Sequence, residues 1–336
     1  HDMTRLLKKI CAILFPAAML VPTGCSKEEV IDISRDLAVV VRVPADVDLG
    51  QRTPGDPGSA SSQQIPRYLY FFTAYTPTEP SSAQSRRVSA FSLSNLSSDS
   101  WTPVENATGT VVNYLRTVIL PMPATDEVML YAIASHDPIP DLQAEVESVQ
   151  GGAVIDEAYI GNLMLSARQS GGGTVSIADV YAGKGTLLTD KDKIDTNATI
   201  VCYHVAAKFD VMYNLSDDFR KGGVYENWRI ASFTLKNLLT GGYYFKPAEN
   251  VPGDGEATTY TFKANEGSNF YGRFDTYIFQ PAPTGENALS FTWEIVLTDD
   301  EGKTTQKLEN TSVVENFETE YATYFRLNVT VNGIGQ

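Results

Sequence analysis

The sequence is poor in the side chains from which most catalytic sites are built. Its 336 residues include three cysteines and three histidines, one of which is His1. Neither the G-x-S-x-G motif of serine hydrolases nor the H-E-x-x-H motif of zinc proteases occurs in it. His136 and His204 are left for acid–base chemistry, and a hydrolase with a dispersed triad at one of them is the least favoured function. We expect no enzymatic activity.

Complete ligand-binding motifs are missing as well. The glycine-rich segments 171–174 and 183–186 lack the spacing of a phosphate-binding loop, and we interpret both as turns. Asp190, Asp192 and Asp195 could offer oxygens to Ca²⁺, but their spacing is not that of an EF-hand loop, so a solvated linker is the better interpretation. The sequence therefore predicts no cofactor and no metal site.

Positive charge is scarce too. Lys and Arg number 26 against 41 Asp and Glu, which gives a formal net charge of −15. A chain this acidic is repelled by phosphate backbones. We therefore expect no nucleic-acid partner.

No apolar run is long enough to span a bilayer, which takes about 20 residues, but a shorter run lies near the beginning. Residues 10–21 are nearly all apolar and follow a basic segment, which is the pattern of a secretory signal peptide. Gly24 and Cys25 end it as in a bacterial lipoprotein signal, although Pro22 stands where such signals have leucine. We expect residues 1–24 to be the signal peptide, with a cloning scar at residues 1–2, and Cys25 to carry the lipid. An ordinary signal peptide is the alternative.

The residues after Cys25 indicate a location. The acidic pair Glu28 and Glu29 is similar to the export tag of surface lipoproteins of Bacteroidetes. Acyl chains on Cys25 would hold the precursor at the outer membrane. Cys202 is then the cysteine left in the mature chain, so no intrachain disulfide is expected.

Period-two hydrophobicity is abundant. One face of an expected first strand carries Leu37, Val39, Val41 and Val43. The segment 51–66, rich in Gly, Pro and Ser, follows as an exposed loop. Further strands are expected at 68–75, 88–93, 111–120, 128–134, 174–181, 200–213, 229–237, 242–245, 258–264, 273–279, 289–297, 303–308 and 323–332, and a short helix at 141–149.

Regular short strands between turns indicate β-sandwiches. The polar stretch 189–197 is the expected domain boundary. It divides the chain into a lipidated propeptide with the first strand (25–52), an N-terminal domain (53–195) and a C-terminal domain (196–336). Exposed Trp101, Trp228 and Trp293 would favour glycan binding, although Trp293 lies in an expected strand, where a core position is favoured.

Four features together resemble the fimbrillin family, the subunits of the protease-matured (type V) pili of Bacteroidetes. They are the lipoprotein start before an apolar strand and an arginine-bearing loop, and the segments 161–167 (GNLMLSA), 203–211 (YHVAAKFDV) and 324–331 (YFRLNVTV). The resemblance spans most of the chain. It implies an all-β fold of two transthyretin-like β-sandwich domains with Greek-key connections.

The resemblance also implies a mode of assembly. A lipidated precursor reaches the surface, a trypsin-like protease cuts it after an arginine, and the first strand leaves a groove that a strand of a neighbouring subunit fills. In this sequence the displaced strand would carry Leu37, Val39, Val41 and Val43. The implied partners are other pilin subunits, the protease, the outer membrane, and a host protein or glycan.

Four arginines lie within reach of such a protease. Arg42 lies within the strand, Arg35 precedes it, and Arg67 adjoins the next strand. Arg52 follows the strand and opens the flexible loop, where proteases prefer to cut. We therefore predict cleavage after Arg52, before Thr53, with Arg67 as the alternative.

The sequence ends at Gln336, soon after the segment 324–331, where shaft fimbrillins continue into a further strand. A tip or accessory position is therefore expected rather than a shaft position, or a lipid-held anchor if Arg52 is not cut. We expect a structural subunit of a surface fimbria that serves adhesion. A surface glycan-binding lipoprotein is the alternative.

Overall fold

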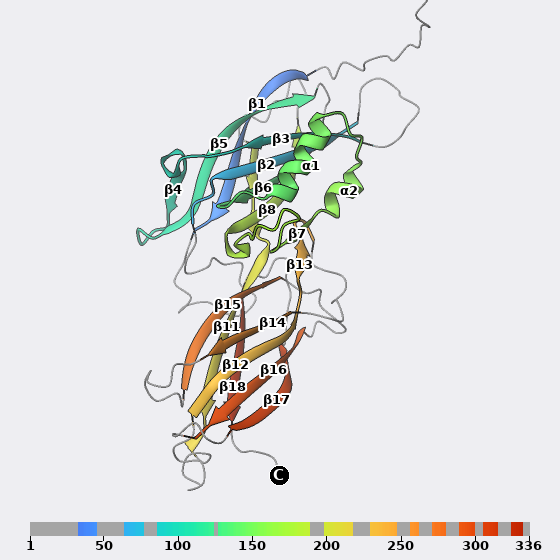
Figure 1. Ribbon diagram of the computed structural model, residues 1–336. Helices are drawn as coiled ribbons and strands as arrows, with labels where there is room; N and C mark the ends of the chain where they lie inside the picture. Colours follow the sequence, from blue (N-terminus) through green and yellow to red (C-terminus); the bar gives the residue numbers. More distant parts are fainter. Residues whose placement is uncertain are drawn as a thin grey trace, which may run out of the picture. The chain divides into compact units, whose positions relative to one another are not determined.

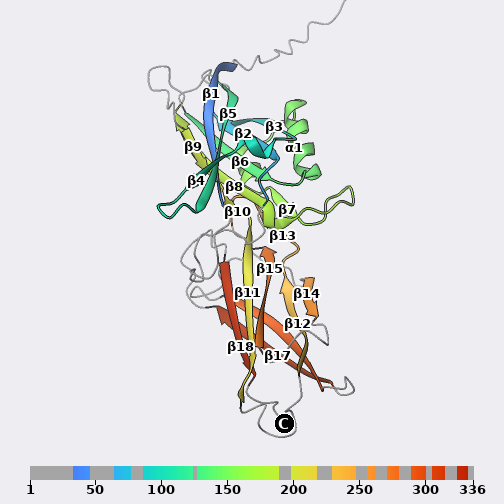
Figure 2. The same cartoon turned by 90° about the vertical axis from the view of Figure 1, so that its left-hand side faces the viewer.

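The computed structural model of the protein describes residues 33–45, 64–76, 86–123, 127–188, 198–217, 229–246, 256–261, 271–279, 289–299, 305–314 and 324–331. Most of these residues lie in β-strands, which confirms the predicted all-β class (Figures 1 and 2). Cys25, Arg52, Thr53, Trp228 and the aspartates of 189–197 lie outside the described residues.

Two sheets from the first half of the chain form a sandwich. One has the order β4 (Thr102–Glu105), β5 (Val111–Pro123), β1 (Ile33–Pro44), β9 (Ala198–Val201). The other has the order β10 (Tyr203–His204), β8 (Val180–Leu188), β6 (Glu127–Ser135), β2 (Tyr68–Tyr75), β3 (Arg87–Leu93). One apolar cluster contains side chains of both sheets, among them Val39 of the first and Phe71 of the second. The two sheets therefore bury a shared core.

Helices cover the other face of the second sheet. The helix α1 (Pro140–Gln150) packs on β2 and β3, which confirms the helix predicted at 141–149 (Figure 1). Leu142 and Val146 of α1 share a second apolar cluster with Phe72 of β2. The short helix α2 (Glu157–Gly161) also contributes to this cluster and was not predicted. No helix among the described residues is long and apolar enough to cross a membrane.

Two further sheets come from the second half of the chain. One has the order β15 (Tyr271–Phe279), β11 (Ala206–Leu215), β18 (Tyr324–Val331). The other has the order β14 (Glu256–Thr261), β12 (Arg229–Leu238), β16 (Leu289–Thr298), β17 (Thr305–Val314). Val211 of the first and Phe233 of the second belong to one apolar cluster, so these sheets also form a sandwich. A two-stranded sheet of β7 (Met164–Ser166) and β13 (Gly241–Tyr243) pairs residues from the two halves.

The stretch expected as one strand at 200–213 is three strands in two different sandwiches. Its first strand, β9, pairs with β1, and β10 pairs with β8. Only β11 belongs to the second pair of sheets. The sheets of the first half therefore extend to His204, beyond the boundary predicted at 195/196, because the chain changes sheets twice without a turn-rich segment.

The segment 183–186, expected as a turn, lies inside β8. A Cβ atom on Gly183 would overlap the carbonyl oxygen of Val201, which closely approaches this strand. Glycine is needed here for close packing rather than for a turn. The segment 171–174 is a turn as predicted, with Gly172 at φ 82° and Gln169 N donating to the carbonyl of Gly173. The strand expected at 174–181 is wrong over most of its length, since a 3₁₀ turn (Ile177–Asp179) precedes β8.

Candidate functional site

The first strand lies inside its sheet, with a hydrogen-bonded neighbour on each side (Figure 2). It pairs antiparallel with β5 along its whole length, from Ile33 opposite Pro123 to Pro44 opposite Asn113. Its middle pairs parallel with β9. Both rows of backbone groups of β1 are therefore engaged where β9 runs beside it.

The period-two pattern of the first strand is present in the structure. Leu37 is 7% exposed, and Val39, Val41 and Val43 have no exposed surface. All four belong to the apolar cluster between the two sheets. Ala38, which alternates with them, is exposed. The four residues predicted to plug the core therefore do pack into it.

The space that β1 fills will be called the β1 groove. Val118, Leu120 and Met122 of β5 and Ala198 and Ile200 of β9 are buried on its two sides. Without β1, the backbone groups of β5 and β9 that face it would have no partners, and the apolar cluster would be exposed to water. An extended strand with one apolar face is what such a groove can bind.

The strand β5 also brings a charged side chain to the β1 groove. Arg116 lies opposite Val41, and directly opposed residues of an antiparallel pair point to the same face. The Nε and Nη1 atoms of Arg116 are buried, and burial lowers the pKa of its guanidinium. No motif in the sequence singles out Arg116, but its period-two spacing from Val118 and Leu120 places it on their face.

The chain returns from the segment 46–63 at Gln64, and residues 64–67 are held one after another by hydrogen bonds. We call them the clamped segment. Gln64 N donates to Asp179 Oδ1 at 2.9 Å. His136 Nδ1 donates to the carbonyl oxygen of Ile65 at 2.9 Å. Burial raises the pKa of Asp179, although the donors Gln64 N and Ser176 Oγ counteract it.

The second half of the clamped segment is held as firmly. Trp101 Nε1 donates to the carbonyl oxygen of Pro66 at 2.9 Å. Arg67 N donates to the carbonyl of Ser135 at 2.8 Å, and the carbonyl of Arg67 accepts from Leu96 N at 2.9 Å. The residues on both sides of the Arg67 peptide bonds are thus fixed to the first sandwich.

These contacts bear on which arginine a protease can reach. A protease needs backbone that it can draw into its own cleft as an extended strand. Arg42 is paired with both β5 and β9, and its carbonyl accepts from Cys202 N at 2.8 Å. The backbone of Arg67 is held in the clamped segment. Both are therefore poor substrates, and cleavage after Arg52, outside the described residues, stays a prediction.

The two histidines that sequence analysis left for catalysis both serve the fold. His136 holds the clamped segment. His204 is buried, its Nδ1 donates to the carbonyl of Ala178 at 3.2 Å, and its ring lies 4.6 Å from that of Tyr181. Among the described residues no group of three or more His, Cys, Asp or Glu is placed to hold a metal ion.

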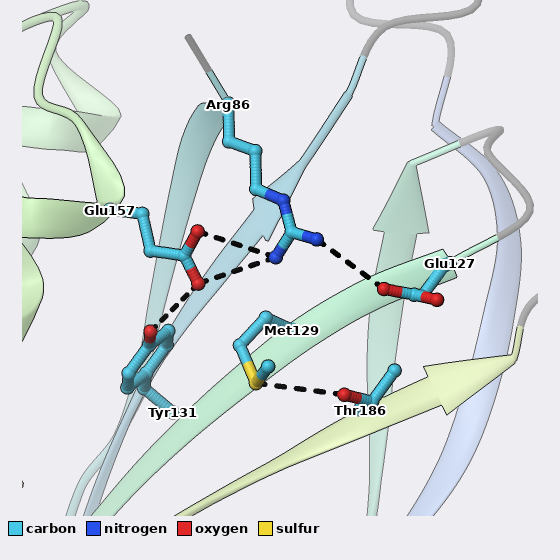
Figure 3. A network of polar contacts seen from close by, with 6 residues as sticks. All are labelled: Arg86, Glu127, Met129, Tyr131, Glu157 and Thr186. Carbon is cyan, nitrogen blue, oxygen red and sulfur yellow. Dashed lines mark hydrogen bonds and ion pairs between the residues drawn. The ribbon is translucent and has the colours of Figure 1, made fainter.

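A pair of carboxylates elsewhere in the first half has the composition of a catalytic site, but its contacts are structural (Figure 3). Arg86 Nη1 donates to both oxygens of Glu157 at 3.3 Å, and its Nη2 donates to Glu127 at 3.3 Å. Tyr131 donates its hydroxyl to Glu157 at 2.8 Å, and burial, followed by this carboxylate, raises the pKa of Tyr131. The network ties α2 to β6.

Two of the three tryptophans considered from the sequence for a glycan-binding platform are buried. Trp101 is 4% exposed and Trp293 is 8% exposed. Trp293 stacks on Phe233 in the second sandwich, with ring centroids 5.9 Å apart. The idea of an exposed platform is therefore wrong for Trp101 and Trp293, and Trp228 lies outside the described residues.

No protein-family model and no curated protein matches the sequence. Solved structures do match. The chain is similar to a candidate cell adhesion protein from Parabacteroides distasonis, with a TM-score of 0.50 and 11% identity over 88% of each chain. This similarity shows a shared fold.

Two fimbrial proteins are also similar. One is a fimbrial assembly protein from Parabacteroides distasonis, with a TM-score of 0.47 and 10% identity over 88% of this chain and 91% of that one. The other is the fimbrial anchor protein Mfa2 from Porphyromonas gingivalis, with a TM-score of 0.40 and 12% identity over the same shares. The fold shared with the cell adhesion protein is in line with the resemblance predicted from the sequence.

Proposed function

We propose that the protein is a structural subunit of a cell-surface fimbria that serves adhesion, made as a precursor lipidated at Cys25 and cut after Arg52. After the cut β1 leaves, and a strand of another pilin subunit takes its place. The position of β1 carries the proposal. It is a central strand that completes the core, and its connection to the clamped segment runs through 46–63, which contains Arg52.

The energetics of the β1 groove support a durable joint. Each buried side chain of this size contributes about 1.5–3 kcal/mol, so the four inward residues of a seated strand contribute roughly 6–12 kcal/mol before ordering costs. An empty groove is correspondingly unfavourable. A strand with the same apolar face would recover this free energy and pair with β5 and β9.

The shared fold with a candidate cell adhesion protein supports a role at the cell surface. The lipoprotein-like start of the sequence supports an outer-membrane precursor whose product is the surface fimbria. We include the tip or accessory position in the proposal. Immunogold labelling at the ends of purified fibres, and not along them, is the expected result.

Cleavage is tested on the lipidated precursor at the cell surface. A trypsin-like protease should give a fragment that begins at Thr53, followed by polymers visible by electron microscopy. Arg52→Gln should abolish both, whereas Arg42→Gln, a matched change within β1, should abolish neither. An intact wild-type precursor after protease treatment would reject the processing step.

Strand departure is tested separately by a disulfide lock. Ala38 and Ile119 lie opposite each other on the exposed face of β1 and β5, so a cysteine at each position is within reach of the other. The oxidised double variant should be cut but should not polymerise, and reduction should restore polymers. Polymerisation of the oxidised form would show that β1 need not leave.

A further inference from the structure

The β1 groove is apolar on its inner face except at one position. Opposite Val39 and Leu37, β5 places Val118 and Leu120, but opposite Val41 it places Arg116. Within the part of the chain that the structure describes, neither Nε nor Nη1 of Arg116 has a hydrogen-bond partner. The seated strand therefore leaves two buried donors of a guanidinium unsatisfied.

Val41 itself cannot correct this. Its side chain has no acceptor, and its neighbour on the other side is the buried Ile200 of β9. A buried donor without an acceptor is destabilising, and more so when it carries charge. The precursor thus holds β1 with a local defect at the 41–116 pair, in a groove that is otherwise well packed.

We propose that Arg116 makes the β1 groove selective for an incoming strand with an acidic side chain at the register of Val41. This inference rests on the proposed strand exchange. A carboxylate there would accept a charge-assisted hydrogen bond from one of these two unsatisfied donors and would neutralise the guanidinium charge. The remaining inward positions call for the same apolar side chains as β1, so the 41–116 pair distinguishes the incoming strand from the leaving one.

The same pair would fix the register of the incoming strand. A slip of one residue turns every inward side chain outward, and a slip of two keeps the apolar face inward but moves the carboxylate to the level of Val39 or Val43. At the level of Val39 the carboxylate would face Val118 and stay unpaired. Arg116 therefore supplies the positional information that a uniformly apolar groove lacks.

The pairing is tested first in the uncut chain, where no exchange is needed. Val41→Asp and Val39→Asp place the same carboxylate two residues apart on the same buried face. Both substitutions should lower the folding equilibrium constant. We expect the constant of Val41→Asp to remain at least tenfold higher than that of Val39→Asp. In an Arg116→Met background this advantage should vanish. Equal losses in wild type would overturn the proposal.

Selection is tested on the chain cut after Arg52 with β1 still seated. The probes are synthetic peptides of residues 33–44, one with the parent sequence ISRDLAVVVRVP and two with Asp at position 41 or 39. The peptide with Asp at 41 should displace β1 with at least tenfold higher apparent affinity than the parent. The peptide with Asp at 39 should be weaker than the parent, and Arg116→Met should remove the preference.

The two arms separate this inference from the proposed function. If Val41→Asp is favoured in the uncut chain but no peptide displaces β1, the strand exchange fails, and the selective role of Arg116 fails with it. If the parent peptide displaces β1 as well as the acidic one does, exchange stands and the selectivity is wrong. Should Arg116→Met not fold, Arg116→Lys, which keeps the charge but not the donors along the guanidinium plane, should show a reduced preference.

Discussion

β1 and β11 occupy matching places in the two sandwiches. β1 lies between the antiparallel β5 and the parallel β9, and β11 lies between the antiparallel β15 and the parallel β18. In each case the parallel partner is the last strand of its sheet in sequence order. Each strand also buries one face in the core of its own sandwich, and Val39 and Val211 are both 0% exposed. The two sheets therefore depend on their first strands in the same way.

The difference lies in how each strand is connected. β11 follows directly on β10, where Val205 N donates to the carbonyl of Val180 at 3.0 Å, and β12 comes after it in the chain, so β11 is covalently joined to other strands of the fold at both ends. Two cuts would be needed to free it. β1 is linked to the clamped segment through 46–63 alone, so one cut there separates it from the rest of the fold. Whether a strand can be removed therefore depends on how it is connected in the chain rather than on how it is paired.

The largest expected effect comes from omitting β1 altogether. A chain that begins at Thr53 should not give a stable monomer, because the roughly 6–12 kcal/mol that the four inward residues contribute is comparable with the whole stability of a domain, about 5–15 kcal/mol. A peptide of residues 33–44 should restore solubility and amide-exchange protection in β2 and β6. A peptide with Ser at positions 37, 39, 41 and 43 is the control. A stable monomer without peptide would show that the first sandwich does not depend on β1.

Matched substitutions in β1 and β11 should have similar effects on stability but different effects on the release of β1. Val39→Ala and Val211→Ala each remove buried methyl groups, so each should lower the free energy of unfolding by about 2 kcal/mol. After cleavage at Arg52, only Val39→Ala should speed the release of β1, measured as loss of the fragment by size-exclusion chromatography. Faster release in Val211→Ala would mean that the sandwiches are coupled more tightly than their connections indicate.

The hydrogen bonds of the clamped segment should protect the peptide bond after Arg67 from the protease. Asp179→Ala removes the acceptor of Gln64 N, and a hydrogen bond of this kind contributes about 1 kcal/mol, so this end of the segment should open more often. We expect a new fragment that begins at Tyr68, detected by N-terminal sequencing. Arg67→Gln in the same background should abolish that fragment. Unchanged cleavage would show that the clamp does not protect Arg67.

The smallest effects concern pH and should have opposite signs in the two sandwiches. Burial raises the pKa of Asp179, so the folded state binds this proton more tightly, and the group's contribution to stability is lost as pH rises through its folded pKa. Lys236 and Lys307 lower the pKa of Glu294, whose contribution is present above its unfolded pKa and lost as pH falls through the folded one. Urea unfolding from pH 3 to 7 of Asp179→Asn and Glu294→Gln, each subtracted from wild type, should give slopes of opposite sign. Slopes of the same sign would contradict one of the two assignments.

Elements with a strong local signal could be predicted from the sequence. The alternation from Leu37 to Val43 correctly indicated a strand with its apolar face in the core, and the helical spacing of Leu142, Val146 and Val149 correctly indicated α1. Both signals depend on one stretch of chain and its period. They needed no knowledge of the neighbours.

Features that depend on distant residues could not be predicted. The clamp joins Gln64 to Asp179, which are 115 residues apart, and the parallel partner of β1 lies beyond the expected domain boundary. The local pattern predicts a turn at Gly183, because the carbonyl of Val201 that excludes a side chain there belongs to a distant part of the sequence. Arg116 was overlooked for the same reason, since its meaning arises only opposite Val41.

The parallel pairing of β1 with β9 has a consequence for any polymer built through the β1 groove. Antiparallel and parallel ladders place their hydrogen bonds differently, so a strand that makes the same bonds to β5 and β9 must run in the direction of β1. Every joint would then repeat one head-to-tail operation, which generates an open filament rather than a closed two-fold pair. Such a filament has two unlike ends, and growth at one of them is chemically distinct from growth at the other.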